Sequence, residues 1–295
     1  MVSGRLAPVA VVIPTYNAPV FLEDALRSVM RQTYGDFTCV VVDDGSTDDT
    51  PERVRELIAH DERFECIEQP NSGPGVARNR GVASSQSDIL AFFDCDDVWD
   101  DRFLEVLVPA LGEAPAAHCV TEGISADGSP HGSFAEWSRT RWQAEGSRLV
   151  RSPPGPTTFE ALVTAQCIAS PGAGIVRRSC FEKVGGYDPR IVLMEDWDLW
   201  IKLARLGPLT FVDEPLFFYR HHTSNRYVSG RTTRRDAYRV RRNAIAHPDN
   251  GAEQRRYARE ASKCFYLDLG RSSLAARTAK QEALGLARLL YAYTF

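Results

Sequence analysis

The amino-acid sequence predicts an α/β fold in which a mostly parallel, Rossmann-like sheet is flanked by helices. One observation is that short apolar, β-branched runs alternate with segments of helical apolar spacing over the first hundred residues. This alternation favours parallel strands, because each helix returns the chain to the same end of the sheet. A second observation is that polar clusters at 14–17, 43–46 and 94–97 directly follow three of the apolar runs. Ligands bind beyond the carboxyl ends of such strands, so we expect the clusters to form one crevice.

The elements of the first half are predicted in chain order. Strands are expected over 9–13, 37–42, 64–67 and 89–93. After residue 22, apolar residues recur on one face of a predicted helix. Thr50-Pro51 offers the second helix an N-cap and a first residue, and a third helix follows Asn71-Ser72-Gly73-Pro74.

The pattern loosens after about residue 105. Residues 112–160 are rich in Gly, Ser, Pro and Trp without clear periodicity, which predicts an irregular region or a mobile loop. Regularity returns with a strand near 173–176, a helix that carries Trp197 and Trp200, and two short strands at 209–212 and 216–219. We expect residues 1–225 to form the main domain and 226–295 a helical C-terminal extension.

The composition is that of an ordinary globular protein. The chain has 295 residues, 43% of them hydrophobic, and a net charge of −4, which gives no sign of nucleic-acid binding. No pair of its seven cysteines has C-x-x-C spacing, so we expect free thiols in a reducing compartment. The N-terminus lacks the features of a signal peptide, and no apolar run approaches the roughly 18 residues that span a bilayer. The expected location is the cytoplasm, with peripheral membrane contact left open.

The acidic run Asp94-Cys95-Asp96-Asp97 directly follows a predicted buried strand. Carboxylates this close repel one another, and a hard cation such as Mg²⁺ or Mn²⁺ would relieve that repulsion. The alternative is a solvated acidic turn that caps the next helix. The local pattern alone does not choose between them.

Asp43 and Asp44 follow another predicted strand at the same edge. A carboxylate there either accepts hydrogen bonds from a base or ribose, or starts the turn through Gly45 and Ser46. The later glycines do not complete G-x-G-x-x-G, because Arg78 stands at the third glycine's position. This disfavours a Rossmann dehydrogenase.

Four motifs stand in order along the chain: Val12-Ile13-Pro14-Thr15-Tyr16-Asn17, Val41-Val42-Asp43-Asp44-Gly45-Ser46-Thr47-Asp48, Asn71-Ser72-Gly73 with Ala77-Arg78-Asn79, and Phe93-Asp94-Cys95-Asp96-Asp97. Together they resemble glycosyltransferase family two, the largest inverting family with the GT-A fold. The resemblance covers roughly residues 9–225. It implies a nucleotide-sugar-binding half over about 1–105 and an acceptor-binding half over about 106–225.

The resemblance also implies roles for matching residues. The donor would be a nucleoside-diphosphate sugar, usually a UDP-sugar, and the acceptor a hydroxyl of a glycan, a lipid-linked sugar or a small molecule. A Mn²⁺ or Mg²⁺ ion would be held by Asp96 and Asp97. His222 of Tyr219-Arg220-His221-His222 is either a further metal ligand or a structural histidine. The implied donor-binding residues are Pro14, Thr15, Tyr16, Asn17, Asp43, Asp44, Asn71, Gly73, Arg78, Asp94, Cys95 and Asp96.

Met194-Glu195-Asp196-Trp197-Asp198-Leu199-Trp200 matches the family's later E-D-x-D-L-W segment. An acceptor hydroxyl must lose its proton as it attacks the anomeric carbon, and a positioned carboxylate that takes it contributes about 10²–10⁴ in rate. Asp196 is the predicted catalytic base. The alternative is that Glu195 and Asp196 only cap the helix.

The sequence lacks the Q-x-x-R-W motif and the membrane helices of processive synthases, so we expect transfer of one sugar per encounter. Two other classes stay open. A non-catalytic sugar-nucleotide-binding protein would bind the donor without a base. A nucleotidyltransferase would need a basic, glycine-rich loop, where this chain has Pro14-Thr15-Tyr16-Asn17.

Residues 226–259 contain ten arginines and three acidic residues. They form either a solvated helical face or a surface for an anionic acceptor, a partner chain or an acidic membrane. The apolar residues that follow either bury a helix or support a homodimer; they are Leu284, Leu286, Leu289, Leu290 and Tyr291.

Overall fold

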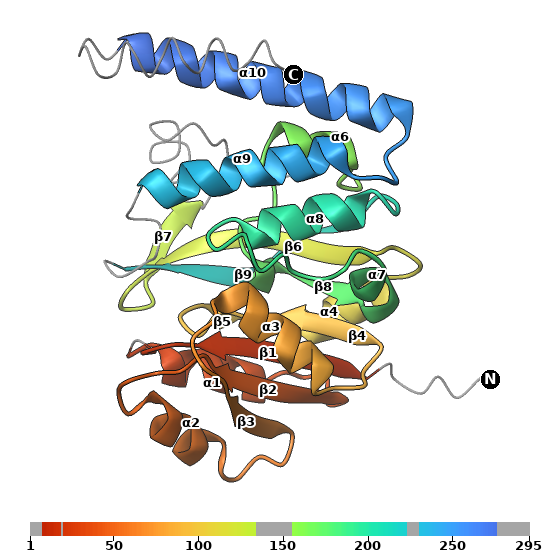
Figure 1. Cartoon of the computed structure of the whole chain (residues 1–295). Helices are drawn as coiled ribbons and strands as arrows, with labels where there is room; N and C mark the ends of the chain where they lie inside the picture. The colour runs from red at the N-terminus through yellow and green to blue at the C-terminus, as the bar shows by residue number, and fades with distance from the viewer. Residues whose placement is uncertain (1–7, 19, 134–154, 223–229, 276–295) are drawn as a thin grey trace, which may run out of the picture.

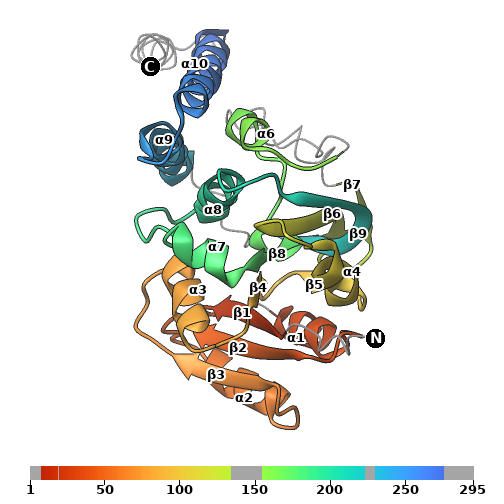
Figure 2. The same cartoon turned by 90° about the vertical axis from the view of Figure 1, so that its right-hand side faces the viewer.

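A computed structural model describes residues 8–18, 20–133, 155–222 and 230–275 of the chain. A central sheet with the strand order β3-β2-β1-β4-β8-β6-β9-β5 runs through the molecule, and β7 pairs with β6. Helices flank this sheet, and two further helices stack at one end (Figures 1 and 2). The predicted α/β fold is confirmed.

The first four strands form the parallel part of the sheet. β1 pairs in parallel with β2 and β4, and β2 pairs in parallel with β3. Every residue of β1 and β4 is buried, as expected for strands covered on both faces, and this explains their continuous apolar runs. The bounds in this half are β1 Val9–Thr15, α1 Leu22–Met30, β2 Phe37–Asp43, α2 Thr50–Ile58, β3 Phe64–Glu68, α3 Pro74–Ala83 and β4 Ile89–Phe92.

Helix α3 packs closely on β1 and β2, and Gly81 makes this approach possible. A Cβ atom at Gly81 would lie 2.3 Å from Cγ1 of Val12 and 3.2 Å from Cγ2 of Val42. The close packing brings the start of α3, with Arg78 one turn further on, to the carboxyl ends of the strands.

The second half of the sheet is mixed. β8 pairs antiparallel with β4 and β6, β9 pairs parallel with β6, and β5 pairs antiparallel with β9. The elements are β5 Val98–Trp99, α4 Phe103–Ala110, β6 Ala116–Ser125, β7 Pro130–Ser133, α6 Phe159–Thr164, η1 Pro171–Ala173, β8 Gly174–Arg177, α7 Arg178–Lys183, α8 Glu195–Ala204 and β9 Thr210–His221.

Two expectations for this half are wrong. Residues 112–160 are not simply irregular, because β6 is a strand of 10 residues, although 134–154 lie outside the described residues. The pairing of β6 with β9 shifts register around Val120, which breaks the alternation that would have marked the strand. The two short strands at 209–212 and 216–219 are one strand, β9, and Asp213 to Pro215 interrupt only its apolar run.

The last described elements are α9 Gly230–Ala246 and α10 Ala252–Ala275. α9 packs on α8, and α10 packs on α6 and α9, so these helices form an outer layer over the second half (Figures 1 and 2). None of the helices in the described ranges is long and apolar enough to cross a membrane. The apolar residues at 284–291 lie outside the described part of the chain.

Candidate functional site

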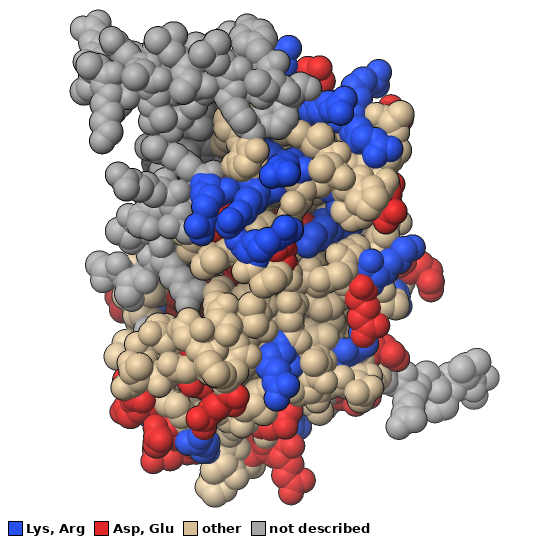
Figure 3. Space-filling view, in the orientation of Figure 1, with Lys and Arg blue, Asp and Glu red and all other residues tan. Residues whose placement is uncertain are grey.

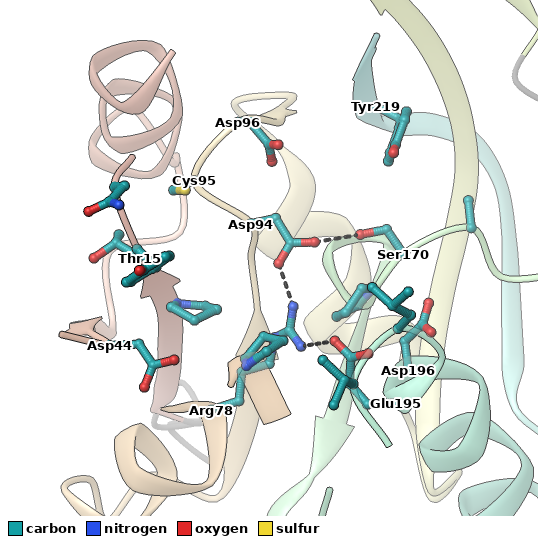
Figure 4. Close-up of a pocket in the computed structure, with 18 of the residues that line it drawn as sticks. Thr15, Asp44, Arg78, Asp94, Cys95, Asp96, Ser170, Glu195, Asp196 and Tyr219 are labelled. Carbon is teal, nitrogen blue, oxygen red and sulfur yellow. Dashed lines mark hydrogen bonds and ion pairs between the residues drawn. The ribbon is translucent and has the colours of Figure 1, made fainter. Parts of the chain in front are cut away.

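A cavity of about 310 Å³ lies at the carboxyl ends of β1 and β4, opposite the start of α8 (Figure 4). The three polar clusters predicted to meet at one edge therefore do contribute to one site. Asp196 and His222 line the cavity together with many of the predicted donor-binding residues, namely Pro14, Thr15, Tyr16, Asn17, Asp44, Arg78, Asp94, Cys95 and Asp96. Four other predicted residues, Asp43, Asn71, Gly73 and Asp97, are not among the described residues that line it.

Asp43 faces its own turn. Its Oδ2 accepts hydrogen bonds from the backbone N–H groups of Gly45 and Ser46, at 3.1 and 3.0 Å, and Oδ1 accepts one from the Ser46 hydroxyl. The Asp43 carboxylate therefore forms the turn through Gly45 and Ser46, which was one of the two alternatives for this residue. The end of β2, on which Asp43 lies, nevertheless borders the cavity.

Asp44 connects the loop after β2 to the loop before α3. Its Oδ1 accepts from the Ser72 N–H at 2.8 Å, and its Oδ2 accepts from the Gly73 N–H at 2.8 Å. Gly73 has a φ of 93°, which favours glycine. The backbone of Asn71 packs against Gly45, where a Cβ atom would lie 2.7 Å from the Asn71 nitrogen. Asn71 and Gly73 thus support the wall that carries Asp44.

Asn17 connects the loops after β1 and β2. Its Oδ1 accepts a hydrogen bond from the Thr47 N–H at 2.8 Å, and its own N–H donates to Ser46 Oγ at 2.9 Å. Asn17 adopts a φ of 45°, a conformation that asparagine tolerates better than most residues. These bonds hold Thr15 and Tyr16 at the cavity wall.

Arg78 lies at the centre of a buried ion-pair network (Figure 4). Its Nη2 lies 2.5 Å from Asp94 Oδ1, and its Nη1 lies 2.8 Å from Glu195 Oε1. Asp94 Oδ2 also accepts a hydrogen bond from Ser170 Oγ at 3.3 Å. Burial by itself would lower the pKa of Arg78, but the nearby carboxylates outweigh burial and raise that pKa. The guanidinium therefore stays charged and fixes one carboxylate from each side of the cavity.

Asp96 and His222 meet on another wall. His222 Nε2 lies 3.0 Å from Asp96 Oδ2, and both residues line the cavity. Within the described ranges, no group of three or more His, Cys, Asp and Glu side chains is arranged to hold a metal. A cation here would have to complete its coordination with ligand oxygens and water.

Asp97 lies behind this wall rather than on it. The side chain is buried, and its Oδ1 accepts a hydrogen bond from the Arg220 N–H at 2.9 Å. Burial raises its pKa well above the ordinary value, and Asp96 and Asp94 add to the rise. The structure thus separates Asp97 from the other two residues predicted to hold a metal.

Arg220 holds the acidic loop against β9. Its Nε donates to the Asp96 carbonyl at 3.0 Å, and its Nη2 forms an ion pair with Asp24 at 3.1 Å. The guanidinium also lies 4.7 Å from the centre of the Phe21 ring. The sequence pattern placed Arg220 inside a motif, but only the tertiary contacts reveal this supporting position.

Asp196 lies at the N-terminal end of α8, with only 4% of its surface exposed. Its Oδ1 accepts the Trp197 N–H at 2.7 Å, and its Oδ2 accepts a hydrogen bond from Gln166 Nε2 at 3.2 Å. Burial raises the pKa of Asp196 well above its usual range, and the neighbouring Glu195 raises it further. Burial also raises the pKa of Glu195, but Arg78 opposes that shift.

Three residues of this region were missed by sequence reasoning. Gln166 and Ser170 come from a stretch without a motif, and they contact Asp196 and Asp94. Asp236 of α9 is fully buried, and its Oδ2 accepts the N–H groups of Val192 and Leu193, which line the cavity. The only sequence signal for Asp236 was a lone acid in an arginine-rich run.

Arg241 shows that the arginine-rich region is not only a solvated face. Its guanidinium lies 5.1 Å from the Trp197 ring centre and 3.9 Å from that of Phe265, and burial lowers its pKa to about 10. The solvated-face alternative is therefore wrong at this position.

Comparisons with known proteins agree with this geometry. The model of glycosyl transferase family 2 matches residues 10–185. An uncharacterized glycosyltransferase of Nostoc sp. is 29% identical over 235 residues, which are 75% of this chain and 67% of that protein. A putative teichuronic acid biosynthesis glycosyltransferase of Bacillus subtilis, TuaG, is 34% identical over 129 residues. That match covers 43% of this chain and about half of the relative, 51%.

Two solved structures share the fold. The S. aureus TarS fragment 1–349 in complex with UDP-GlcNAc has a TM-score of 0.63 at 17% identity, covering 97% of this chain and 89% of that one. The mannosyltransferase PcManGT of Pyrobaculum calidifontis in complex with GDP-Man and Mn²⁺ has a TM-score of 0.62 at 17% identity, covering 98% and 81%. These likenesses establish that the fold is the GT-A fold.

Proposed function

Because this chain belongs to glycosyl transferase family 2 and is a glycosyltransferase, we propose that it transfers a single sugar from a nucleoside-diphosphate donor, first of all a UDP-sugar, to an acceptor hydroxyl with inversion. One observation carries this proposal: Asp94 and Asp96 face the same cavity as Asp196, which comes from a segment about one hundred residues later. The site thus offers a charged side for the departing diphosphate and a buried carboxylate for the proton.

The donor nucleoside would lie between the loops after β1 and β2. Tyr16, a large aromatic residue with 37% of its surface exposed, lines this part of the cavity beside Thr15 and Asp44. An exposed ring offers a stacking face to a base. The relative TarS is bound to UDP-GlcNAc and PcManGT to GDP-Man, so UDP and GDP are the first nucleotides to test.

Asp96 and His222 would hold a Mn²⁺ or Mg²⁺ ion on the diphosphate. Their chemistry fits, because a carboxylate oxygen and an imidazole nitrogen already lie 3.0 Å apart at the cavity wall. Mg²⁺ sites commonly use one or two protein ligands and take the rest from phosphates and water. When bound, such an ion offsets the negative charge that develops on the leaving diphosphate.

Asp196 would act as the base. The acceptor hydroxyl gives its proton to this carboxylate while its oxygen forms a bond to the anomeric carbon. The bond from that carbon to the diphosphate breaks on the opposite face, and the diphosphate leaves with the electron pair. Glu195 is less suited to the role, because its carboxylate is engaged by Arg78 at 2.8 Å. A raised pKa makes Asp196 the stronger proton acceptor.

The test is thermal stability with UDP, GDP, dTDP or CDP, each with and without Mn²⁺. A ligand that binds only the folded state at 100 times its Kd adds about 2.7 kcal/mol. We expect one nucleotide to stabilise the protein in the presence of metal, and Asp96→Ala to remove the effect. Asp101→Ala, an exposed acid five residues further along, is the matched control. A sugar donor that carries the stabilising nucleotide is then tested for slow hydrolysis by the protein. Binding of this donor without any hydrolysis would favour a non-catalytic sugar-nucleotide-binding protein.

A further inference from the structure

Helix α9 carries a row of arginines beside the cavity, and we propose that this row binds the anionic part of the acceptor, an oligomer or polymer with phosphate or carboxylate groups in its repeat. The row comprises Arg235, Arg239 and Arg242, and we call it the arginine stripe. Arg190, in the segment before α8, extends it. This inference rests on the proposed function, because it names the acceptor class for the same site.

The stripe occupies one face of the helix. Its members are spaced four and three residues apart, so their side chains lie on the same side of α9 over roughly 10 Å. The opposite side of α9 is buried through Ala237, Val240 and Ala244. The arginines therefore point away from the packed layer, as the gathering of basic side chains over α9 in Figure 3 shows.

The exposed charge of this surface is positive. Arg190 and Arg235 have side chains 72% and 56% exposed, and Arg242 is also exposed. The acids that pair with them, Asp188 and Asp236, have side chains only 9% and 0% exposed. A mobile anion thus meets guanidinium groups, while the carboxylates lie beneath them.

Like charges at this spacing weaken a helix, and the buried Asp236 opposes this by pairing with Arg235 and Arg239 at 3.5 and 3.6 Å. On the lower part of the face in Figure 3, over α2 and β3, acidic side chains dominate. On this face the basic side chains therefore gather around α9, in a chain whose net charge is −4. A solvated face needs no such separation, whereas a surface for a polyanion does.

The stripe is joined to the cavity by direct contacts. Arg239 Nη1 donates a hydrogen bond to the Arg190 carbonyl. Asp236, on the turn between the stripe arginines, accepts the N–H groups of Val192 and Leu193 at 2.9 and 3.0 Å. Because Val192 and Leu193 line the cavity, an acceptor chain lying along the stripe has its next unit near Asp196.

Guanidinium groups bind phosphates and carboxylates through paired hydrogen bonds, and a row of them suits a ligand with regularly spaced anions. An acidic membrane surface is the other class that a basic helix face attracts. Within the described residues, the stripe has no apolar flank for insertion. Tyr257 and Val192 are the exposed large apolar residues of this half there, and Val192 belongs to the cavity. The oligomeric anion is therefore the better fit.

The experiment uses the full chain and a fluorescently labelled short-chain polyphosphate, with binding followed by anisotropy in EDTA at low salt. The stripe variant combines Arg190→Gln, Arg235→Gln and Arg242→Gln. The matched control combines Arg27→Gln, Arg31→Gln and Arg55→Gln, three exposed arginines on the other half of the molecule. We expect at least tenfold weaker binding for the stripe variant and less than a twofold change for the control, with unlabelled dextran not competing.

Three results would overturn the inference. An equal loss in both variants would mean that surface charge in general binds the probe. Displacement of polyphosphate by excess UDP would mean that the probe occupies the donor site. Binding to phosphatidylglycerol vesicles, lost in the stripe variant and without any binding of polyphosphate, would identify a membrane surface instead. Nucleotide-dependent stabilisation is recorded for each variant, so a failed donor site is told apart from a failed acceptor surface.

Discussion

Two acidic regions face each other across the cavity, and their surroundings differ. Asp94 and Asp96, after β4, are each a little over a quarter exposed and each contact a basic side chain, Arg78 or His222. Asp196, at the start of α8, is 4% exposed, and it accepts hydrogen bonds from two neutral groups, the Trp197 N–H and the Gln166 amide.

This difference teaches how similar side chains can serve different steps. A partly exposed carboxylate beside a basic side chain is placed to hold a metal or a charged ligand. A buried carboxylate without a cation of its own binds a proton more readily, since burial raises its pKa. Some active sites need one acid that stabilises charge and another that accepts a proton. In such sites the two acids typically lie in environments of different polarity.

The sharpest way to break the comparison is Asp196→Asn. The amide keeps the size of the side chain but cannot take a proton, so donor turnover should fall about 10²–10⁴-fold. Nucleotide binding should change less than about twofold, because the donor side of the cavity is untouched. Asp249→Asn, at an exposed acid, is the control. Turnover near the wild-type rate in Asp196→Asn would remove Asp196 as the base.

Arg78→Met removes the cation that joins the two regions. It leaves Glu195 and Asp94 without their charged partner, and breaking a buried pair in this way costs about 3–5 kcal/mol of unfolding free energy. The loss, measured by urea unfolding, should be smaller at pH 5 than at pH 8, because a protonated Glu195 no longer needs a counter-charge. Arg27→Met, which breaks an exposed pair with Glu23, should cost no more than about 1 kcal/mol. Equal losses for the two variants would contradict the central position of Arg78.

Asp236→Ala tests whether α9 shapes the wall on the Asp196 side. Two backbone N–H groups lose a charged acceptor, and a hydrogen bond to a charged group contributes about 1.5–3 kcal/mol. We expect the free energy of unfolding to fall by about that amount. The rate of nucleotide-sugar hydrolysis should fall by a larger factor than the affinity for the nucleotide. Asp236→Asn retains an acceptor oxygen and should recover most of the turnover. If both variants affected nucleotide affinity and turnover alike, α9 would have only a structural effect.

The same contrast explains which parts were predictable from sequence. Strands β1 to β4 and the loops after them have local signals, because a buried parallel strand is a continuous apolar run and its end is marked by polar residues. Asp94, Asp96 and Asn17 could therefore be assigned to one edge of the sheet from their positions in the sequence alone. Asp97 could not be separated from Asp96 by pattern, since the Asp97 side chain turns toward the backbone of Arg220, more than one hundred residues away.

The wall around Asp196 has no comparable local sequence signal. Gln166 and Ser170 reach the site from an irregular stretch between α6 and β8, and their importance comes only from the partners that the fold brings to them. Asp236 is hidden in an arginine-rich helix for the same reason. Motifs predicted the acids of the site, whereas the residues that tune those acids follow from tertiary contacts.

The smallest expected effect, and the finest test of the contrast, is Gln166→Leu. The amide of Gln166 donates to Asp196 and so favours its charged form, and its loss should raise the pKa of Asp196 further. A base is active when deprotonated, so the acid limb of the pH–rate profile, expected above the ordinary carboxyl range, should move to still higher pH. Gln86→Leu, at an exposed glutamine, should leave the profile unchanged.

The pH dependence of the free energy of unfolding reports independently on Asp196. The folded pKa of Asp196 lies above the unfolded one, so the folded state binds the proton more tightly. This contribution to stability is complete below the unfolded pKa and is lost as pH rises through the folded value. Gln166→Leu should extend that loss to higher pH, in step with the kinetic limb. An acid limb that moves while the stability profile does not would assign the kinetic pKa to a group other than Asp196, and Gln166 would then not be the positioning residue of the base.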